Sequence, residues 1–336
     1  MACADKKDWR ADIVEIYEAN RPKLPKWLKV FMSGTPRKMD CGASKAVYVF
    51  GDKAISVEKA GPQDVNRQAV IRKRLKKIPK KYRKHFNYYK NEFLWYDYVF
   101  RELSLCPEGT LRDMFNKTLW DMFNEILRDM SNKTLKGISN KTLMDMFGEK
   151  YNITDQMIKD LITALCECHK AGLAIVDLKP DNIMLCKCDC LAFIDLDSAV
   201  PMPYREGVIY ATDWWNIIRY TRRRDKKMLK GSDWIAMSLV VMMHYAARYF
   251  TEDREKHKDL IYYVSRDFVS KDRTYDRIRI LLSSTDFPTE LGKAAYELLR
   301  QYDYKKMKLP DKEYIDRLIT VSGGDPNPKR KWWLKF

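Results

Sequence analysis

The stretch 177–182, with the sequence D-L-K-P-D-N, constrains the fold most, because two short apolar runs follow it around a polar turn. The runs cover 183–185 and 191–194, and the second ends on Asp195, thirteen residues after Asn182. Two such runs around a turn predict a β-hairpin. The hairpin would hold Asn182 and Asp195 at its two open ends, near Asp177 and Lys179.

These four side chains form a group with a definite chemistry. Three of them carry oxygen, which suits a hard divalent cation beside a polyphosphate, because magnesium takes oxygen ligands and rarely builds an all-protein cage. Asp177 can accept a proton from an attacking hydroxyl, and Lys179 can neutralise charge on a moving phosphoryl group. The pattern therefore predicts a phosphoryl-transfer site.

The motif D-L-K-P-D-N-I-M-L at 177–185 resembles the catalytic loop of the protein kinase superfamily, whose usual form is H-R-D-L-K-P-x-N. The run 193–197, F-I-D-L-D, stands where the family keeps D-F-G. The resemblance implies an α+β, bilobal protein-kinase-like fold. A lead segment would cover 1–30, a small β-rich N-lobe 31–105 and a larger, mostly helical C-lobe 106–336.

The same resemblance implies an ATP-dependent phosphotransferase that acts on serine or threonine of protein substrates, with ATP and Mg²⁺ as cofactors. Asp177 and Lys179 would be catalytic, and Asn182 and Asp195 would hold the metal. Ile175 and Val176 replace the family's His and Arg, and Asp197 replaces its Gly. Without the loop arginine no cation would receive an activation-loop phosphate, so we expect constitutive activity.

In the N-lobe, the runs 46–50 and 54–59 predict two strands. Gly42 and Val47 resemble the end of a glycine-rich loop that lacks the full G-x-G-x-x-G. Lys59 is the candidate for the lysine that meets the α- and β-phosphates, and Lys53 is its rival. Cys106 begins a C-P-E-G-T-L run that resembles the adenine-binding hinge.

The acid that would clamp the strand lysine stays open, because no glutamate occurs between Lys59 and Glu92. In the preferred interpretation, the basic segment 64–81 forms the clamp helix, and Asp64 or no acid supplies the clamp. In the alternative, a helix over 81–104 carries Glu92. The preferred interpretation makes 86–105 one or two strands.

An eight-residue repeat occupies about 111–150, with leucines at 111, 119, 127, 135 and 143. Because eight residues turn a helix by about 800°, its apolar face rotates by roughly 80° per unit. One straight amphipathic helix cannot keep all units on one side, and we expect an insertion after the hinge.

Beyond the repeat, 154–169 predicts a helix capped by Thr154 or Asp155. The apolar run 234–247 predicts a buried helix, and Asp233 at its start would hold the backbone of the catalytic loop, as the resemblance implies. The cysteines around 166–168 and 186–190 are candidate ligands for a zinc site, although their spacing is not C-x-x-C.

The composition, 46% hydrophobic and 12% aromatic, indicates a globular protein, and the formal charge of +17 favours acidic partners. We expect a protein substrate of acidic character, with nucleic acid an optional partner, and no membrane contact. Eight scattered cysteines and no visible signal peptide indicate a reducing compartment, cytoplasmic or nuclear. The degenerate motifs and the repeat are typical of a fast-evolving lineage such as a large DNA virus.

Other functions remain open at this point. The sparse glycine loop and Asp197 favour a pseudokinase, a catalytically weak or inactive binding scaffold of the same fold. A small-molecule kinase of related fold is a third possibility, and a nucleic-acid-binding protein driven by charge alone is a fourth.

Overall fold

The computed structural model describes part of the chain, in thirteen ranges. These are 25–33, 38–41, 45–50, 53–59, 62–95, 98–104, 109–111, 114, 153–186, 189–202, 226–252, 289–302 and 309–326. Gly42, Cys106, most of the repeat and the chain from 203 to 225 lie outside these ranges.

The fold is mixed α+β, with a small antiparallel sheet and several helices. It divides into two compact units: the first holds 1–72 and 87–107, and the second holds 73–86 and 108–336. The segment 73–86 therefore belongs with the second unit, whereas the expected lobes at 31–105 and 106–336 placed it in the first.

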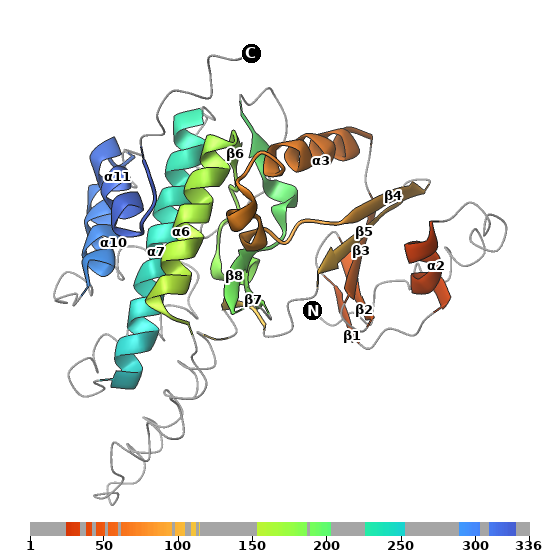
Figure 1. Cartoon of the computed structure of the whole chain (residues 1–336), viewed down its shortest axis with the longest axis horizontal. Helices are drawn as coiled ribbons and strands as arrows, with labels where there is room; N and C mark the ends of the chain where they lie inside the picture. Colours follow the sequence, from red (N-terminus) through yellow and green to blue (C-terminus); the bar gives the residue numbers. More distant parts are fainter. Residues whose placement is uncertain are drawn as a thin grey trace, which may run out of the picture. The chain divides into compact units, whose positions relative to one another are not determined.

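The first unit is built on a five-stranded antiparallel sheet in the order β1-β2-β3-β5-β4 (Figure 1). The strands are β1 (Lys38–Cys41), β2 (Lys45–Phe50), β3 (Lys53–Lys59), β4 (Asn91–Trp95) and β5 (Tyr98–Ser104). Tyr48 pairs with Ile55, and Val57 with Phe100, and these four side chains are buried. The two strands expected at 46–50 and 54–59 are confirmed as β2 and β3.

Two helices accompany this sheet along the chain, α2 (Lys26–Ser33) and α3 (Pro62–Leu75). Proline at the first helical position suits α3, because its missing N–H would be unpaired there in any case. Ile71 and Leu75 are buried on α3. The helix expected in the basic segment 64–81 is therefore confirmed as far as Leu75. The alternative helix over 81–104 is wrong, because β4 and β5 occupy half of that range, between 91 and 104.

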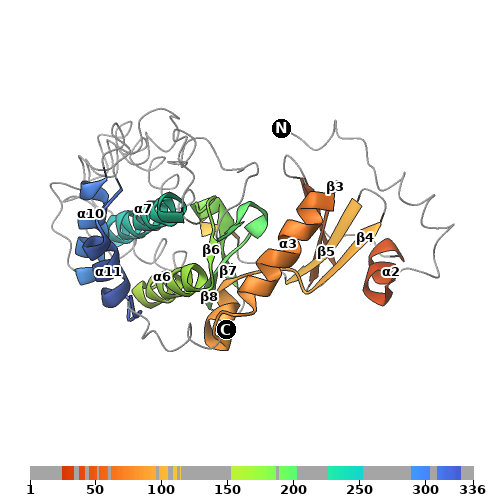
Figure 2. The same cartoon turned by 90° about the horizontal axis from the view of Figure 1, so that it is seen from above.

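The second unit is mostly helical. It contains α6 (Asp155–Lys170), α7 (Lys226–Glu252), α10 (Glu290–Gln301) and α11 (Lys312–Val321). Figures 1 and 2 show α6 beside α7, with α10 packed on α7 and α11 on α10. A short 3-10 helix, η3 (Lys80–His85), packs on α6. The helices expected at 154–169 and 234–247 are confirmed.

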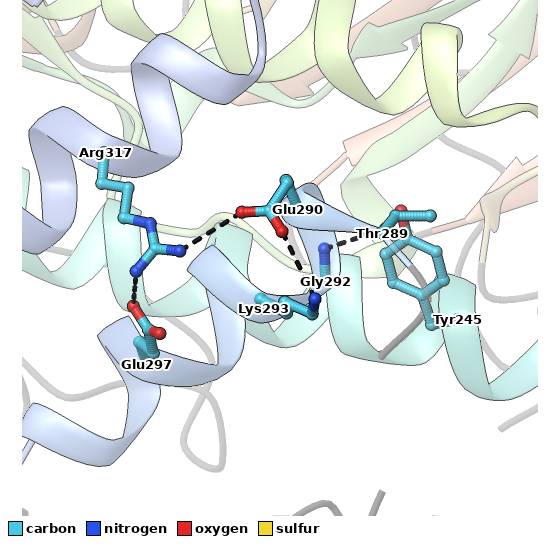
Figure 3. Close-up of polar contacts among 7 residues, drawn as sticks. All are labelled: Tyr245, Thr289, Glu290, Gly292, Lys293, Glu297 and Arg317. Atoms are coloured by element: carbon cyan, nitrogen blue, oxygen red, sulfur yellow. Dashed lines mark hydrogen bonds and ion pairs between the residues drawn. The ribbon is translucent and has the colours of Figure 1, made fainter. Parts of the chain in front are cut away.

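Side-chain caps fix where these helices begin. The hydroxyl of Thr154 accepts a hydrogen bond from the backbone N–H of Met157 at 3.2 Å and starts α6. Thr289 does the same for Gly292 at the start of α10 (Figure 3). Thr289 also donates to the Tyr245 hydroxyl, which in turn donates to Asp155 at 2.9 Å. Polar contacts thus join the first turns of α6 and α10 to α7.

Ion pairs on the surface join α10 to α11. Figure 3 shows Arg317 of α11 between Glu290 and Glu297 of α10. Exposed pairs of this kind contribute about 0–1 kcal/mol each, so the buried face of α10, with Leu291, Leu298 and others, supplies most of its stability.

None of the helices in the described ranges has the length and apolar character needed to cross a bilayer.

Candidate functional site

The hairpin expected after the D-L-K-P-D-N stretch is present in the second unit. Strand β7 (Ile183–Cys186) pairs with β8 (Cys190–Phe193) in an antiparallel register that sets Ile183 opposite Phe193. At the end of the hairpin away from the turn, the backbone N–H of Ile194 donates a hydrogen bond of 2.9 Å to the carbonyl of Asn182. Asp195 is therefore one residue past the partner of Asn182, at the position that the sequence predicts.

Three of the four predicted side chains meet at one carboxylate oxygen. Oδ2 of Asp177 receives the Lys179 ammonium at 3.0 Å and the Asn182 amide at 3.0 Å. The same amide nitrogen donates to the Asp177 carbonyl at 2.9 Å. The side chains of Asp177 and Lys179 are 12% and 15% exposed, so the group is held in place and partly exposed to solvent.

This hydrogen bonding sets the direction of the Asn182 amide. Because Nδ2 makes both bonds to Asp177, Oδ1 is the atom left to accept a donor or coordinate a cation. An amide oxygen and a carboxylate such as that of Asp195 are hard oxygen donors of the kind that Mg²⁺ prefers. These donor types fit the expected magnesium ion, which Asn182 and Asp195 would hold.

The backbone before Asp177 is held by hydrogen bonds to one buried carboxylate. Asp233 of α7 is 0% exposed, and it accepts the N–H of Ile175 and the N–H of Val176 at 2.7 Å each. His169, in the last turn of α6, donates to the same carboxylate at 2.8 Å. The predicted role of Asp233 in holding the loop backbone is confirmed.

The loop needs this support because its backbone is strained. Among the described residues, positive φ outside glycine occurs at Val176 (71°), Asp189 (48°) and Asp195 (53°). A β-branched residue with positive φ is a genuine outlier, and such conformations cost about 1–3 kcal/mol each. Val176 immediately precedes Asp177 of the candidate site, and Asp195 belongs to the site. Strain held by surrounding structure is typical of functional sites.

Buried apolar side chains surround the strained residue. Val176 lies in a cluster with Ala174, Val200, Met202 and Leu229, and all five are buried. Strands β6 (Leu173–Ala174) and β9 (Val200–Pro201) pair beneath it. Val176 is therefore an apolar anchor for the loop backbone.

His169 is neutral in this environment. Burial lowers its pKa, although the hydrogen bond to Asp233 acts in the opposite direction. Its Nδ1 is buried with no hydrogen-bond partner among the described residues, so a proton there would be left unpaired. The neutral tautomer with hydrogen on Nε2 satisfies the geometry. This role of His169 was not predicted from the sequence.

In the first unit the nucleotide-binding candidates are only partly described. Val47 is half-buried on β2, opposite Ser56, and Lys59 is the last residue of β3, opposite Tyr98. The side chain of Lys59 lies outside the described part, as do Gly42 and Cys106 altogether. These four assignments stay predictions.

Lys53, the alternative candidate for the phosphate-binding lysine, forms an ion pair within the sheet. Lys53 forms an ion pair with Glu102 at 2.9 Å and is 53% exposed. Hydrogen bonds from Lys53 and Asn91 lower the pKa of the Glu102 carboxyl. Lys53 thus has a local structural partner on β5.

A buried arginine organises the first unit, and sequence reasoning missed it. Arg101 of β5 is 2% exposed, with ion pairs to Glu58 of β3 and, at 2.9 Å, to Glu92 of β4. Its guanidinium lies 5.3 Å from the centre of the Tyr89 ring, whose other neighbour, Arg72 of α3, is at 5.5 Å. Glu92 therefore sits on a strand and serves an arginine, so its assignment as the acid of a clamp helix is wrong.

The cysteines of α6 are buried in the core. Burial raises the pKa of the Cys166 thiol to about 11 and raises that of Cys168 as well, so both stay protonated near neutral pH. Among the described residues no group of three or more His, Cys, Asp or Glu side chains could hold a metal ion together. The magnesium site expected from the sequence is not of this kind, because one of its two expected ligands is the amide of Asn182.

The structure thus brings together Asp177, Lys179 and Asn182 by direct contact, and the hairpin register sets the backbone of Asp195 one residue past the partner of Asn182. It leaves Lys59 and Val47 in the other unit. Comparison of the sequence with protein-family models and with curated proteins gives no significant match, so the assignment of function rests on these residues and their geometry.

Proposed function

We propose that the protein is an ATP-dependent phosphotransferase of the protein-kinase type that transfers the γ-phosphate to serine or threonine of protein substrates. The observation that carries this proposal is the convergence of Lys179 and Asn182 on one oxygen of Asp177. It occurs on a strained loop that Asp233 holds from below. A surface ion pair needs no such support.

Each residue has a role in the proposed reaction. Asp177 orients the substrate hydroxyl and accepts its proton, and the contacts at Oδ2 keep the carboxylate in one orientation. Lys179 stabilises charge on the transferring phosphoryl group. Magnesium, held by Asn182 and Asp195, would neutralise the phosphate oxygens when bound.

The first unit supports the same proposal through its order of elements. Along the chain, three strands are followed by helix α3 and then by two further strands, and the five strands form one sheet. Lys59 is the last residue of the third strand. In protein kinases the phosphate-binding lysine lies on strand β3. We assign Lys59 to the phosphates, Gly42 and Val47 to the nucleotide loop and Cys106 to the hinge, with the two units as the two lobes.

One observation favours the second candidate, a pseudokinase that binds without turnover. Helix α3 contains no glutamate, and two acids of the sheet, Glu58 and Glu92, are both paired with Arg101. A lysine clamp of the usual Lys–Glu kind is therefore not formed by these two acids. In this reading the protein binds nucleotide or partner and serves as a scaffold.

The deciding experiment measures ATP turnover and ATP binding for the wild type and for Asp177→Asn. Loss of a general base lowers turnover by about 10²–10⁴-fold. Binding is measured by thermal shift, because ligand at about 100 times its Kd stabilises the folded state by about 2.7 kcal/mol. Asp189→Asn is the matched control: the same change on the exposed hairpin turn, at a positive φ that asparagine tolerates.

The outcomes separate the candidates. Turnover that Asp177→Asn abolishes and Asp189→Asn leaves intact supports the kinase, and binding of ATP and Mg²⁺ without turnover supports the pseudokinase. A panel of protein and metabolite acceptors separates a protein kinase from a small-molecule kinase. Neither turnover nor a thermal shift would reject both forms of the proposal.

The proposal also predicts how activity responds to phosphorylation. Because Val176 fills an apolar cluster, the loop has no cation there to receive a phosphate on the segment after Asp195. Treatment of the purified protein with a phosphatase should change its turnover by less than about twofold. A many-fold loss on that treatment, restored by rephosphorylation, would contradict constitutive activity.

A further inference from the structure

A surface rich in lysine lies on the second unit, apart from the residues of the candidate site. The segment 73–86, called the basic turn below, joins the end of α3 to the bridge at Phe86, and six of its lysines are exposed. They are Lys73, Lys76, Lys77, Lys80, Lys81 and Lys84. The sequence holds no carboxylate between Asp64 and Glu92.

The basic turn is anchored firmly to the core. Ile78 and His85 are each 1% exposed, and His85 Nδ1 lies 2.7 Å from the carbonyl oxygen of Leu191 on β8. Phe86 forms a β-bridge with Phe193, and their ring centres are 5.5 Å apart. The lysines are thus displayed on a fixed base, so a partner does not have to order the backbone on binding.

The arginines of the basic turn are used to build it. Arg83 donates to the carbonyl of Ile78 at 2.7 Å and to that of Lys76, and Arg74 donates to the carbonyl of Met202 at 3.2 Å. Guanidinium is the group that matches a carboxylate with two parallel bonds, whereas lysine is a flexible point charge. The groups left facing solvent are therefore the kind that binds phosphate without fixed geometry.

Little negative charge offsets these lysines. None of the six forms an ion pair within the described ranges. The carboxylates of the adjoining helix α6 that act on the basic turn are Asp160 and Glu167, and Glu167 is paired with Lys170 at 2.8 Å. A positive potential over the basic turn follows from this imbalance.

We propose that the basic turn binds nucleic acid through its phosphate backbone, without reading the base sequence. Release of condensed counterions from the polyanion would drive this binding. A membrane surface fits less well, since the exposed large hydrophobic side chains of the described residues, Val70 and Leu94, both lie outside the basic turn. This proposal does not depend on the proposed phosphotransferase activity.

The test measures binding of a fluorescent single-stranded DNA of about 20 nucleotides, and of the matching duplex, by anisotropy between about 50 and 200 mM salt. The variant replaces three lysines of the basic turn by glutamine: Lys77→Gln, Lys80→Gln and Lys81→Gln. Each phosphate contact removed should reduce the slope of log K against log salt by about 1, so the slope should fall by up to about 3. Affinity at the lowest salt should fall at least about tenfold.

The control keeps the net charge of the variant but moves the changes elsewhere. It replaces three exposed lysines on other helices: Lys26→Gln, Lys293→Gln and Lys312→Gln. Its affinity and salt slope should stay close to those of the wild type. Thermal unfolding of both triple variants checks that they fold, and turnover of the basic-turn variant should be unchanged.

Three results would overturn the proposal. The first is equal loss of affinity in the variant and the control, which would mean that net charge alone attracts the DNA. The second is no loss in the variant. The third is displacement of the labelled DNA by poly-glutamate or by anionic lipid vesicles as efficiently as by unlabelled DNA, when the competitors are compared at equal concentrations of negative charge. That result would make an acidic polypeptide or a membrane the partner.

Discussion

Replacing Asp233 by asparagine isolates the contribution of the carboxylate beneath the loop. The side chain keeps its size, but only one of its two terminal atoms still accepts hydrogen bonds. If Oδ1 of the asparagine keeps the bonds from His169 and Ile175, its amide nitrogen must face the N–H of Val176, which now bonds to Oδ1 of Asp233. One buried donor then loses its acceptor, and two other bonds lose their charge.

The cost follows from these changes. A buried donor without a partner costs about 1–3 kcal/mol, and a hydrogen bond to a charged group is worth about 1 kcal/mol more than a neutral one. The sum is about 3–5 kcal/mol. At about 2–4 °C per kcal/mol for a unit of this size, the melting temperature of the second unit should fall by roughly 10 °C.

Catalysis should suffer separately from stability. Asp177 is the next residue after the supported pair, so a loosened backbone misplaces its carboxylate. Misplacement of a reacting group by about 1 Å costs about 10²-fold in rate. In the proposed kinase, kcat should therefore fall about 100-fold well below the melting temperature, while the KM for ATP changes by less than about threefold.

The assays are thermal and urea unfolding together with steady-state kinetics, and Asp316→Asn is the control. Asp316 forms an exposed pair with Lys312 on α11, which is worth about 0–1 kcal/mol. If Asp233→Asn changes the free energy of unfolding by no more than this control does, the carboxylate does not hold the loop, and the reasoning is refuted.

Three other predictions follow from the structure. Burial lowers the pKa of His85 and of His169, so as the pH falls these histidines take up protons in the unfolded chain before they do so in the folded protein. The free energy of unfolding should therefore be highest above about pH 6.5 and should fall below it, by up to about 1.4 kcal/mol per pH unit for each histidine. Urea unfolding at a series of pH values measures this. A gain in stability between about pH 6.5 and 5.5 would contradict it. Thr154→Ala should destabilise the second unit by about 1 kcal/mol through loss of the α6 cap, with Thr154→Ser as the control that retains it, and equal melting temperatures for the two variants would count against the cap. Arg101→Met should destabilise the first unit by about 3–5 kcal/mol, because two carboxylates lose their buried partner, and neutralising both as glutamines should restore much of the loss. A rescue that fails would mean that Arg101 acts by packing alone.

The parts of the fold that the sequence predicts well are those decided over short distances. The hairpin of β7 and β8 follows from two apolar runs around a turn, and its register then sets Asn182 and Asp195 at one end. The strands β2 and β3 and helix α6 follow from local periodicity and a cap in the same way. Asp233 is the exception: its partners are 57 and 58 residues away, and the resemblance to a family, not periodicity, pointed to it.

The missed features depend on contacts between distant segments. Arg101 sits among aromatic and apolar residues that predict a strand, and nothing in that pattern announces a buried charge. Its partner Glu58 is 43 residues earlier, on a strand that becomes its neighbour only in the folded sheet. The role of His169 is hidden similarly, because Asp233 lies 64 residues later. Periodicity reports which face is buried but not which polar groups meet there.

The paired strands β7 and β8 also separate the candidate site from the turn that joins them. Four residue pairs span about 14 Å of extended chain between the Asn182 end and the turn at Asp189. A dye or short peptide grafted at Asp189, which is exposed, would report on events at the opposite end without touching the reacting groups. The hairpin thus offers a place for an optical probe that tests the proposed nucleotide binding.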